Sequence, residues 1–125
     1  MTDITYKVEN NLDPVEFIDV LNRSTLGERR PVNDFNRIKK MCENANLIIT
    51  ARLDGKLIGV SRSITDFAYC TYLSDLAVDI DYQKKGIGKK LLEETKNQAP
   101  QAKLILLSAP TAVNYYPKIG MKKHN

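Results

Sequence analysis

Two glycines and a cluster of lysines lie together in the middle of the chain, in segment 83–88, QKKGIG. A strand-like stretch precedes them, and apolar residues at helical spacing, including Leu91 and Leu92, follow them, so the glycines fall at the start of a predicted helix. The first amides of a helix lack intrahelical partners, and glycine lets a ligand approach the backbone closely. With the helix dipole and the lysine charge, these features predict an anion site whose expected ligand is phosphate.

A glycine turn followed by lysines is also common in proteins that bind no ligand there, where the glycines only form a tight turn and the lysines only face solvent. The spacing alone leaves both interpretations open. Two better-known phosphate motifs do not fit the segment. A dinucleotide fingerprint needs a third glycine where Leu91 stands, and a P-loop needs serine or threonine where Lys90 stands. The segment is therefore neither of these nucleotide-binding motifs.

A longer pattern surrounds the two glycines. The spacing V-x-x-x-x-Q-x-x-G-x-G, from Val78 to Gly88, resembles the acyl-CoA-binding motif of the GNAT superfamily of N-acyltransferases. Segment 115–121, YYPKIGM, resembles the F-Y-x-K-x-G-F segment near the chain end in that family. The two motifs occur in the family order, and the resemblance extends loosely over about 33–121.

The resemblance implies acetyl-CoA as co-substrate, with no metal. In the family the turn amides bind the coenzyme A pyrophosphate, and the pantetheine arm lies where a bulged fourth strand splays from the fifth. On this chain the implied pantetheine contacts are backbone groups of Leu76, Ala77 and Val78. The implied pyrophosphate contacts are Gln83, Lys84, Lys85, Gly86, Ile87, Gly88 and Lys89.

Acyl transfer to an amine needs a neutral nitrogen and a proton for the departing thiolate. Tyr116, four residues before Gly120, stands where the family tyrosine protonates the coenzyme A sulfur, and a phenol with a pKa of about 10 can make that donation. Asp75, on the predicted central strand, is the best available carboxylate for a base. It could equally bond a loop amide, in which case water would take the proton.

The C-terminal part departs from the family pattern in two ways. Ala109 stands where the family often has an asparagine seven residues before the tyrosine, and only residues 121–125 remain for the final strand that the family usually adds. A sheet edge left open there would be completed by a partner chain, as in a homodimer, or the C-terminal strand is truncated.

Periodicity and turn residues predict the elements that position these groups. We expect strands at 4–8 and 72–78, helices at 14–23, 34–43 and 86–98, a hairpin at 47–64 around Asp54-Gly55, and a strand at 103–108 parallel to the central one. On the central strand Leu73, Asp75 and Ala77 should share one face, and Cys42 should lie on the core face of the second helix.

Two groups of residues outside the motifs have open roles. Arg29 and Arg30 lie in the break at 24–32, where they could meet an acidic substrate or a coenzyme phosphate, or simply be solvated. The aromatic residues Phe67, Tyr69 and Tyr72, before and at the start of the central strand, could shape a substrate pocket, although filling the core is the commoner role.

Composition limits the class of protein. A chain of 125 residues with 42% apolar and 27% charged residues suits one globular domain, here 1–125. The net charge of +4 is spread along the chain, which argues against a nucleic-acid partner. Two cysteines make neither a zinc motif nor a disulfide framework. No apolar run reaches membrane-spanning length and charged residues occupy the N-terminal segment, so the expected compartment is the cytoplasm, without membrane contact.

These observations together predict an α/β (α+β) domain with a mixed, mostly antiparallel sheet flanked by helices. The resemblance implies an acetyl-CoA-dependent N-acetyltransferase that transfers an acetyl group to a primary amine of a small molecule or a protein. The alternative is a non-catalytic acyl-CoA-binding or regulatory module that keeps the turn and lacks a competent acid, base or substrate pocket.

Overall fold

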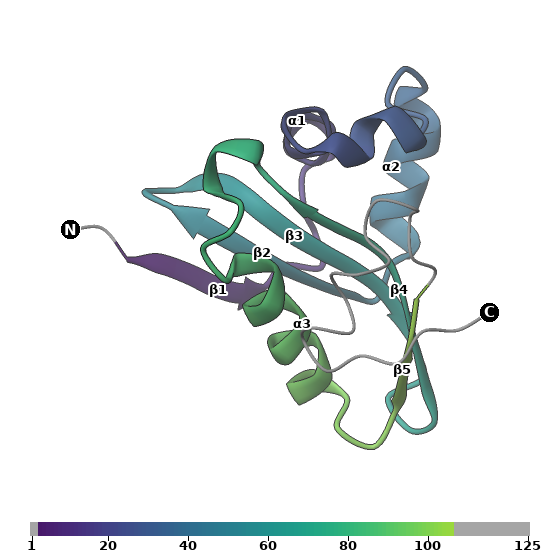
Figure 1. The fold of residues 1–125 in the computed structure, drawn as a ribbon. Coiled ribbons are helices and arrows are strands. Elements are labelled where there is room, and N and C mark those ends of the chain that lie inside the picture. Colours follow the sequence, from purple (N-terminus) through teal and green to yellow (C-terminus); the bar gives the residue numbers. More distant parts are fainter. Residues whose placement is uncertain (1–2, 107–125) are drawn as a thin grey trace.

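The fold is built on an antiparallel sheet to which one parallel strand is added (Figure 1). The computed structural model describes residues 3–106. Its strands are β1 (Ile4–Val8), β2 (Leu47–Leu53), β3 (Lys56–Thr65), β4 (Cys70–Val78) and β5 (Lys103–Ile105). They lie in chain order, with β5 parallel to β4 and the other neighbours antiparallel. The predicted mixed, mostly antiparallel sheet is confirmed.

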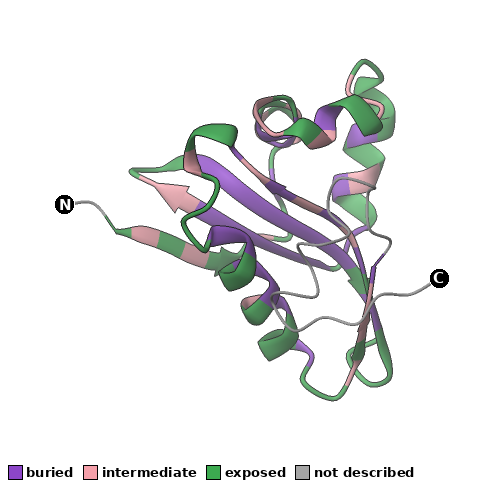
Figure 2. Cartoon of the chain, viewed as in Figure 1, coloured by how far each residue is buried: buried purple, intermediate pink, exposed green. Residues whose placement is uncertain are grey.

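Helices cover both faces of the sheet (Figure 1). α1 (Pro14–Arg23) and α2 (Phe35–Asn44) pack on one face, and α3 (Ile87–Gln98) packs on the other. Figure 2 shows that burial is concentrated in the central strands and in the helix faces turned toward them. Cys42 lies in the core between the sheet and helices α1 and α2, as predicted, and burial raises the pKa of its thiol to about 11. Within 3–106, no helix combines the length and apolar character that crossing a membrane would require.

Local sequence signals account for most element boundaries. The Asp13 carboxylate accepts a hydrogen bond from the Val15 amide at 2.9 Å, which caps α1. Asp54 and Gly55, with φ angles of 52° and 82°, form the predicted tight turn between β2 and β3, because a type I′ turn needs positive φ at both central residues. The predicted break at 24–32 contains a short 3₁₀ helix, Thr25–Arg29.

A bulge in β4 overturns the expected alternation of its side chains. Asp75 pairs with Arg62, whereas the next residue of β3, Ser63, pairs with Leu73, so Ser74 is an extra residue in β4. The extra residue turns Leu73 onto the α3 side of the sheet, where it packs against Leu92. The prediction that Leu73 shares a face with Asp75 was therefore wrong.

The start of α3 approaches the sheet closely at one glycine. A Cβ atom on Gly59 of β3 would lie 3.1 Å from Ile87 Cγ2 and 3.2 Å from Leu91 Cδ1. Both are tighter than ordinary van der Waals contacts, so a side chain at Gly59 would require the Ile87 and Leu91 side chains to shift by a few tenths of an ångström. Glycine at this position lets the beginning of α3 lie directly against β3.

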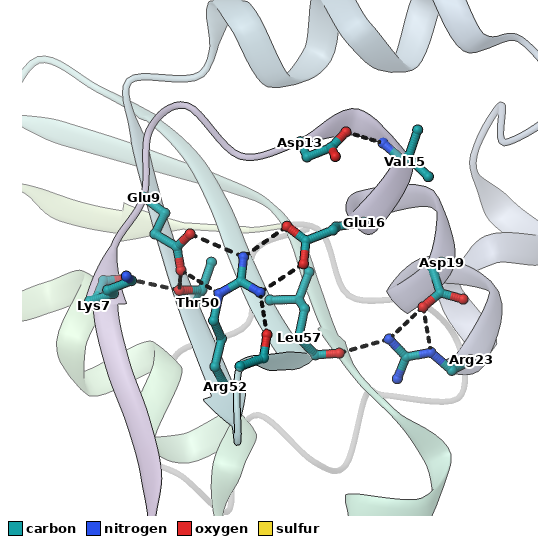
Figure 3. A network of polar contacts seen from close by, with 11 residues as sticks. Lys7, Glu9, Asp13, Val15, Glu16, Asp19, Arg23, Thr50, Arg52 and Leu57 are labelled. Carbon is teal, nitrogen blue, oxygen red and sulfur yellow. Dashed lines mark hydrogen bonds and ion pairs between the residues drawn. The ribbon is translucent and has the colours of Figure 1, made fainter.

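An ion-pair network ties α1 to the edge of the sheet (Figure 3). The Arg52 guanidinium on β2 lies between two carboxylates, with its Nε 2.8 Å from Glu9 and its Nη1 2.7 Å from Glu16. Thr50 also donates a hydrogen bond to Glu9. Burial opposes the Glu9 charge, but the bonds from Arg52 and Thr50 outweigh burial and hold the pKa of that carboxyl below its usual range.

We expect this network to make stability depend on pH. Because the folded pKa of Glu9 is lowered, its contribution is fully present above the unfolded glutamate pKa of about 4.3 and is lost as pH falls through the folded value. Urea unfolding between pH 6 and pH 3 should therefore show a shallower loss of stability for Glu9→Gln than for the unmodified chain. If the free energy of unfolding fell equally steeply with pH in both proteins, the protonation of Glu9 would not be coupled to folding.

Candidate functional site

The predicted anion turn connects β4 to α3. Lys84 has a φ of 65° and Gly86 a φ of 81°, and α3 begins at Ile87. The Lys90 amide donates to the Gly86 carbonyl at 3.0 Å, which closes the first helical turn. A Cβ atom built on Gly86 would meet nothing within 4 Å, so the backbone borders open space there.

The amides of this turn are available to a ligand. Ile87, Gly88 and Lys89 form the first turn of α3, where an amide has no intrahelical acceptor, and no backbone group within residues 3–106 accepts from them. The Ile87 side chain is buried between α3 and the sheet, whereas the side chains of Lys84, Lys85 and Lys89 are exposed around the turn. Outward amides beside mobile positive charge are suited to bind a phosphate.

Asp79 anchors the start of this connection. Its side chain is 1% exposed, its amide donates to the Ile58 carbonyl at 2.8 Å, and its carboxylate accepts from the Asp81 amide at 2.9 Å. Arg23 of α1 forms an ion pair with the other carboxylate oxygen and donates to the Leu57 carbonyl at 2.7 Å. Nothing local in the sequence indicated this pairing, because 56 positions separate its two partners.

Gln83 holds the turn against β4. Its Nε2 donates to the Val78 carbonyl at 3.0 Å. The glutamine of the resembled motif therefore uses one side-chain N–H to bind the end of β4. This contact links the two predicted binding segments, 76–78 and 83–89.

β4 has a free edge beside the turn. β5 pairs with β4 only at Cys70, Thr71 and Tyr72, so within the described part of the chain no strand covers that edge from 73 to 78. Because the Asp79 amide points to β3, alternation turns the backbone groups of Ala77 to β3 and those of Leu76 and Val78 to the free edge. Leu76 and the Val78 amide could therefore pair with a ligand there, because the Val78 carbonyl already accepts from Gln83, while Ala77 would have to contact the ligand by other groups.

Asp75 is enclosed by arginines. Its side chain is 0% exposed, one carboxylate oxygen forms an ion pair with Arg30, and the other forms an ion pair with Arg62. A carboxylate in this position must give up an ion pair to accept a proton, so the geometry weighs against Asp75 as the base, whose assignment stays a prediction. Arg30 is neither freely solvated nor available to a coenzyme phosphate, because its guanidinium is used here.

The remaining predicted site residues divide into two groups. Tyr116, Tyr115 and Gly120 lie outside the described residues, so their roles stay predictions. The aromatic residues Phe67, Tyr69 and Tyr72 are 48%, 79% and 38% exposed, so the expectation that they fill the core was wrong. Residues 3–106 contain no group of three or more histidine, cysteine, aspartate or glutamate side chains placed to hold a metal ion.

A family model and the related sequences all point to N-acetyltransferases. A model of the acetyltransferase (GNAT) domain matches residues 25–125. The uncharacterized N-acetyltransferase ycf52 of Pyropia yezoensis is 26% identical over 102 residues, 76% of this chain and 57% of the relative. Glucosamine 6-phosphate N-acetyltransferase 1 of Dictyostelium discoideum is 25% identical over 118 residues, 86% of this chain and 75% of the relative. The chain thus spans little more than half the length of the first of these relatives.

Solved structures share the fold. A GNAT-family acetyltransferase of Streptococcus pneumoniae superposes with a TM-score of 0.80 at 20% identity, over 96% of this chain and 88% of that one. An aminoglycoside N-acetyltransferase, AAC(6')-Iy, in complex with CoA superposes with a TM-score of 0.77 at 11% identity, over 100% of this chain and 91% of that one. These likenesses confirm the architecture predicted from the two motifs.

Proposed function

The chain belongs to the GNAT family of acetyltransferases, and from this premise we propose that it transfers an acetyl group from acetyl-CoA to a primary amine, which attacks the thioester directly. The observation that carries the proposal is the free edge of β4 next to the open amides at the start of α3. A polar strand edge suits an amide-containing arm, and a helix start with exposed lysines suits a pyrophosphate. Gln83, in the connection between β4 and α3, bonds the end of β4 and so links the two features.

Each part of the site has one task in this reaction. The amides of Ile87, Gly88 and Lys89 hold the pyrophosphate, and the edge groups of Leu76 and Val78 hold the pantetheine arm. The amine nitrogen then forms a bond to the acetyl carbon, the carbon–sulfur bond breaks, and the sulfur takes a proton from the Tyr116 hydroxyl. The amine passes its proton to water, because both oxygens of Asp75 are engaged by arginines, and the Tyr116 phenolate takes a proton back from water, which leaves the acetylated amine and the coenzyme A thiol as products.

A non-catalytic acyl-CoA-binding module is the second candidate. The observation that favours it is the same enclosure of Asp75, which removes the carboxylate that was the best available base. Such a module would bind acetyl-CoA through the turn without accelerating acetyl transfer. Binding alone therefore does not separate the two candidates, and turnover does.

A screen of amines by thiol release from acetyl-CoA tests the proposal. The amines should include amino sugars, because a relative is named for glucosamine 6-phosphate and a fold neighbour for aminoglycosides, together with polyamines and lysine peptides. We expect at least one amine to give steady thiol release above the hydrolysis background, with the acetylated amine detected by mass spectrometry. Acetyl-CoA binding in calorimetry with no turnover on any amine would favour the binding module instead.

A further inference from the structure

The β4 bulge is held by three charged side chains, Arg30, Asp75 and Arg62, which we call the bulge cluster. A bulge leaves backbone groups of its extra residue without partners in the sheet. Here the Ser74 carbonyl accepts from Arg30 Nη2 at 2.8 Å, and the Ser74 hydroxyl accepts from Arg62 Nη2 at 3.0 Å. The same two guanidiniums form the ion pairs with Asp75, so the Ser74 carbonyl, the Ser74 hydroxyl and the buried carboxylate are satisfied together.

The bulge cluster also connects β4 to three neighbouring elements, the 3₁₀ helix, α2 and β3. Arg30 follows the 3₁₀ helix after α1, and its Nη1 donates to the Arg29 carbonyl at 2.8 Å. Arg62 lies on β3, and its Nη1 donates to the Met41 carbonyl of α2 at 3.1 Å. The side chains of Asp75, Arg62 and Arg30 are 0%, 8% and 22% exposed. Burying these charged side chains is costly, and a protein with well-packed apolar residues in their place would often be as stable. We therefore infer that the three charged side chains control the register of β4 rather than stability alone.

The position of the bulge decides which backbone groups reach the free edge. Backbone direction alternates along a strand, so a shift of one residue exchanges the groups that face β3 with those that face outward. With the extra residue at Ser74, Leu76 and Val78 face outward. These are the groups that would pair with the pantetheine arm.

We propose that the bulge cluster is a positioning unit for acyl-CoA: it fixes the bulge at Ser74 and so directs the backbone groups of Leu76 and Val78 to the free edge of β4. This inference rests on the proposed function. It makes Asp75 a positioning residue that acts through the backbone of β4, and it makes the two arginines its partners. None of the three need touch the acetyl group or the amine.

The first test measures the bulge without any ligand. Arg30→Ala removes the partner that solvent can reach, while Asp75 keeps Arg62, and Arg37→Ala removes an exposed arginine of α2 as the matched control. Amide hydrogen exchange at Asp75 and Ala77, which face β3, should become about tenfold faster in Arg30→Ala, as expected when a strand pairing opens more easily. The Ile49 amide of β2, and every amide in Arg37→Ala, should be unchanged. Unchanged exchange at Asp75 and Ala77 would overturn the proposal.

The second test separates positioning from catalysis by acetyl-CoA affinity and pH profile. Arg30→Ala and Asp75→Asn should each weaken acetyl-CoA binding by about tenfold, and the double variant should be little worse than either, because residues of one unit are not additive. The kcat should fall by less than about threefold, and the pH profile of kcat/KM should keep its shape, because no reacting proton is involved. Should Arg30→Ala not fold, Arg30→Lys, which keeps the charge but not the two-pronged contact, should show a smaller loss of affinity.

The outcomes distinguish this inference from the proposed function. Wild-type affinity in Arg30→Ala, with normal turnover of the unmodified chain, would overturn only the positioning unit. Loss of turnover in Asp75→Asn at unchanged acetyl-CoA affinity, with an altered pH profile, would make Asp75 the catalytic base and would also overturn it. No binding of acetyl-CoA by the unmodified chain would overturn the proposed function and this inference together, while the exchange measurement would still report on the bulge.

Discussion

Replacing Tyr116 by phenylalanine is expected to lower kcat by roughly ten- to a thousandfold, which is near the range for the loss of a general acid. The coenzyme A thiol has a pKa of about 8 to 9, so a departing thiolate at neutral pH benefits from a proton donor close to the sulfur. Phenylalanine keeps the ring and its packing while it removes the hydroxyl. The melting temperature and the acetyl-CoA affinity should therefore stay nearly unchanged, which calorimetry and steady-state kinetics would measure.

Tyr115→Phe is the control for that experiment, because the resembled family tolerates an apolar aromatic residue at this position. It removes a hydroxyl from the adjacent residue and should leave kcat close to that of the unmodified chain. Full turnover in both variants, with the chemical step rate-limiting, would make Tyr116 a packing residue. The thiolate would then leave unassisted or take its proton from water.

Replacing Gly86 by alanine is expected to weaken acetyl-CoA binding by about ten- to a hundredfold, the loss that corresponds to one hydrogen bond to a charged group. The Gly86 backbone borders open space, so the added Cβ would not meet protein atoms, and we expect it to obstruct the approach of a phosphate to the turn. The φ of 81° also disfavours a side chain at this position. Titration calorimetry with acetyl-CoA would measure the loss.

Gly55→Ala controls for backbone strain in the Gly86 experiment. Gly55 has a φ of 82°, and a Cβ there would also meet nothing within 4 Å, but it lies in the turn between β2 and β3. It should lower stability by a similar amount and leave acetyl-CoA affinity unchanged. Lys90→Ala controls for charge, because Lys90 stands beside the turn but pairs with Glu94 at 3.3 Å. Equal losses of affinity for Gly86→Ala and Lys90→Ala would refute the anion turn.

The two substitutions test different candidates. Loss of affinity in Gly86→Ala is expected for an acetyltransferase and for a binding module alike, since both bind acyl-CoA through the turn. Loss of kcat in Tyr116→Phe has meaning only for an enzyme. Together they separate the site that holds the co-substrate from the group that completes the reaction.

Most of the helices and strands could be predicted from the sequence, because they depend on residues close together in the chain, and the anion turn stays a prediction from the same local signals. Asp54-Gly55 can form the hairpin turn, Asp13 can cap a helix that starts at Pro14, and Gly86 can adopt a positive φ whatever surrounds them. The two motifs likewise have fixed spacing along the chain, so they point to the family without any knowledge of which residues meet in space.

The position of the bulge at Ser74 and the partners of Asp75 could be identified only in the folded chain. An extra residue in a strand is visible only against the neighbouring strand, and here the register between Arg62 and Asp75 reveals it. The charge of Asp75 is met by Arg30, which lies 45 positions away and whose local sequence suggested an exposed loop. A carboxylate's role depends on what surrounds it in space, so the same aspartate that composition and position offered as a base is, once folded, enclosed between two guanidiniums.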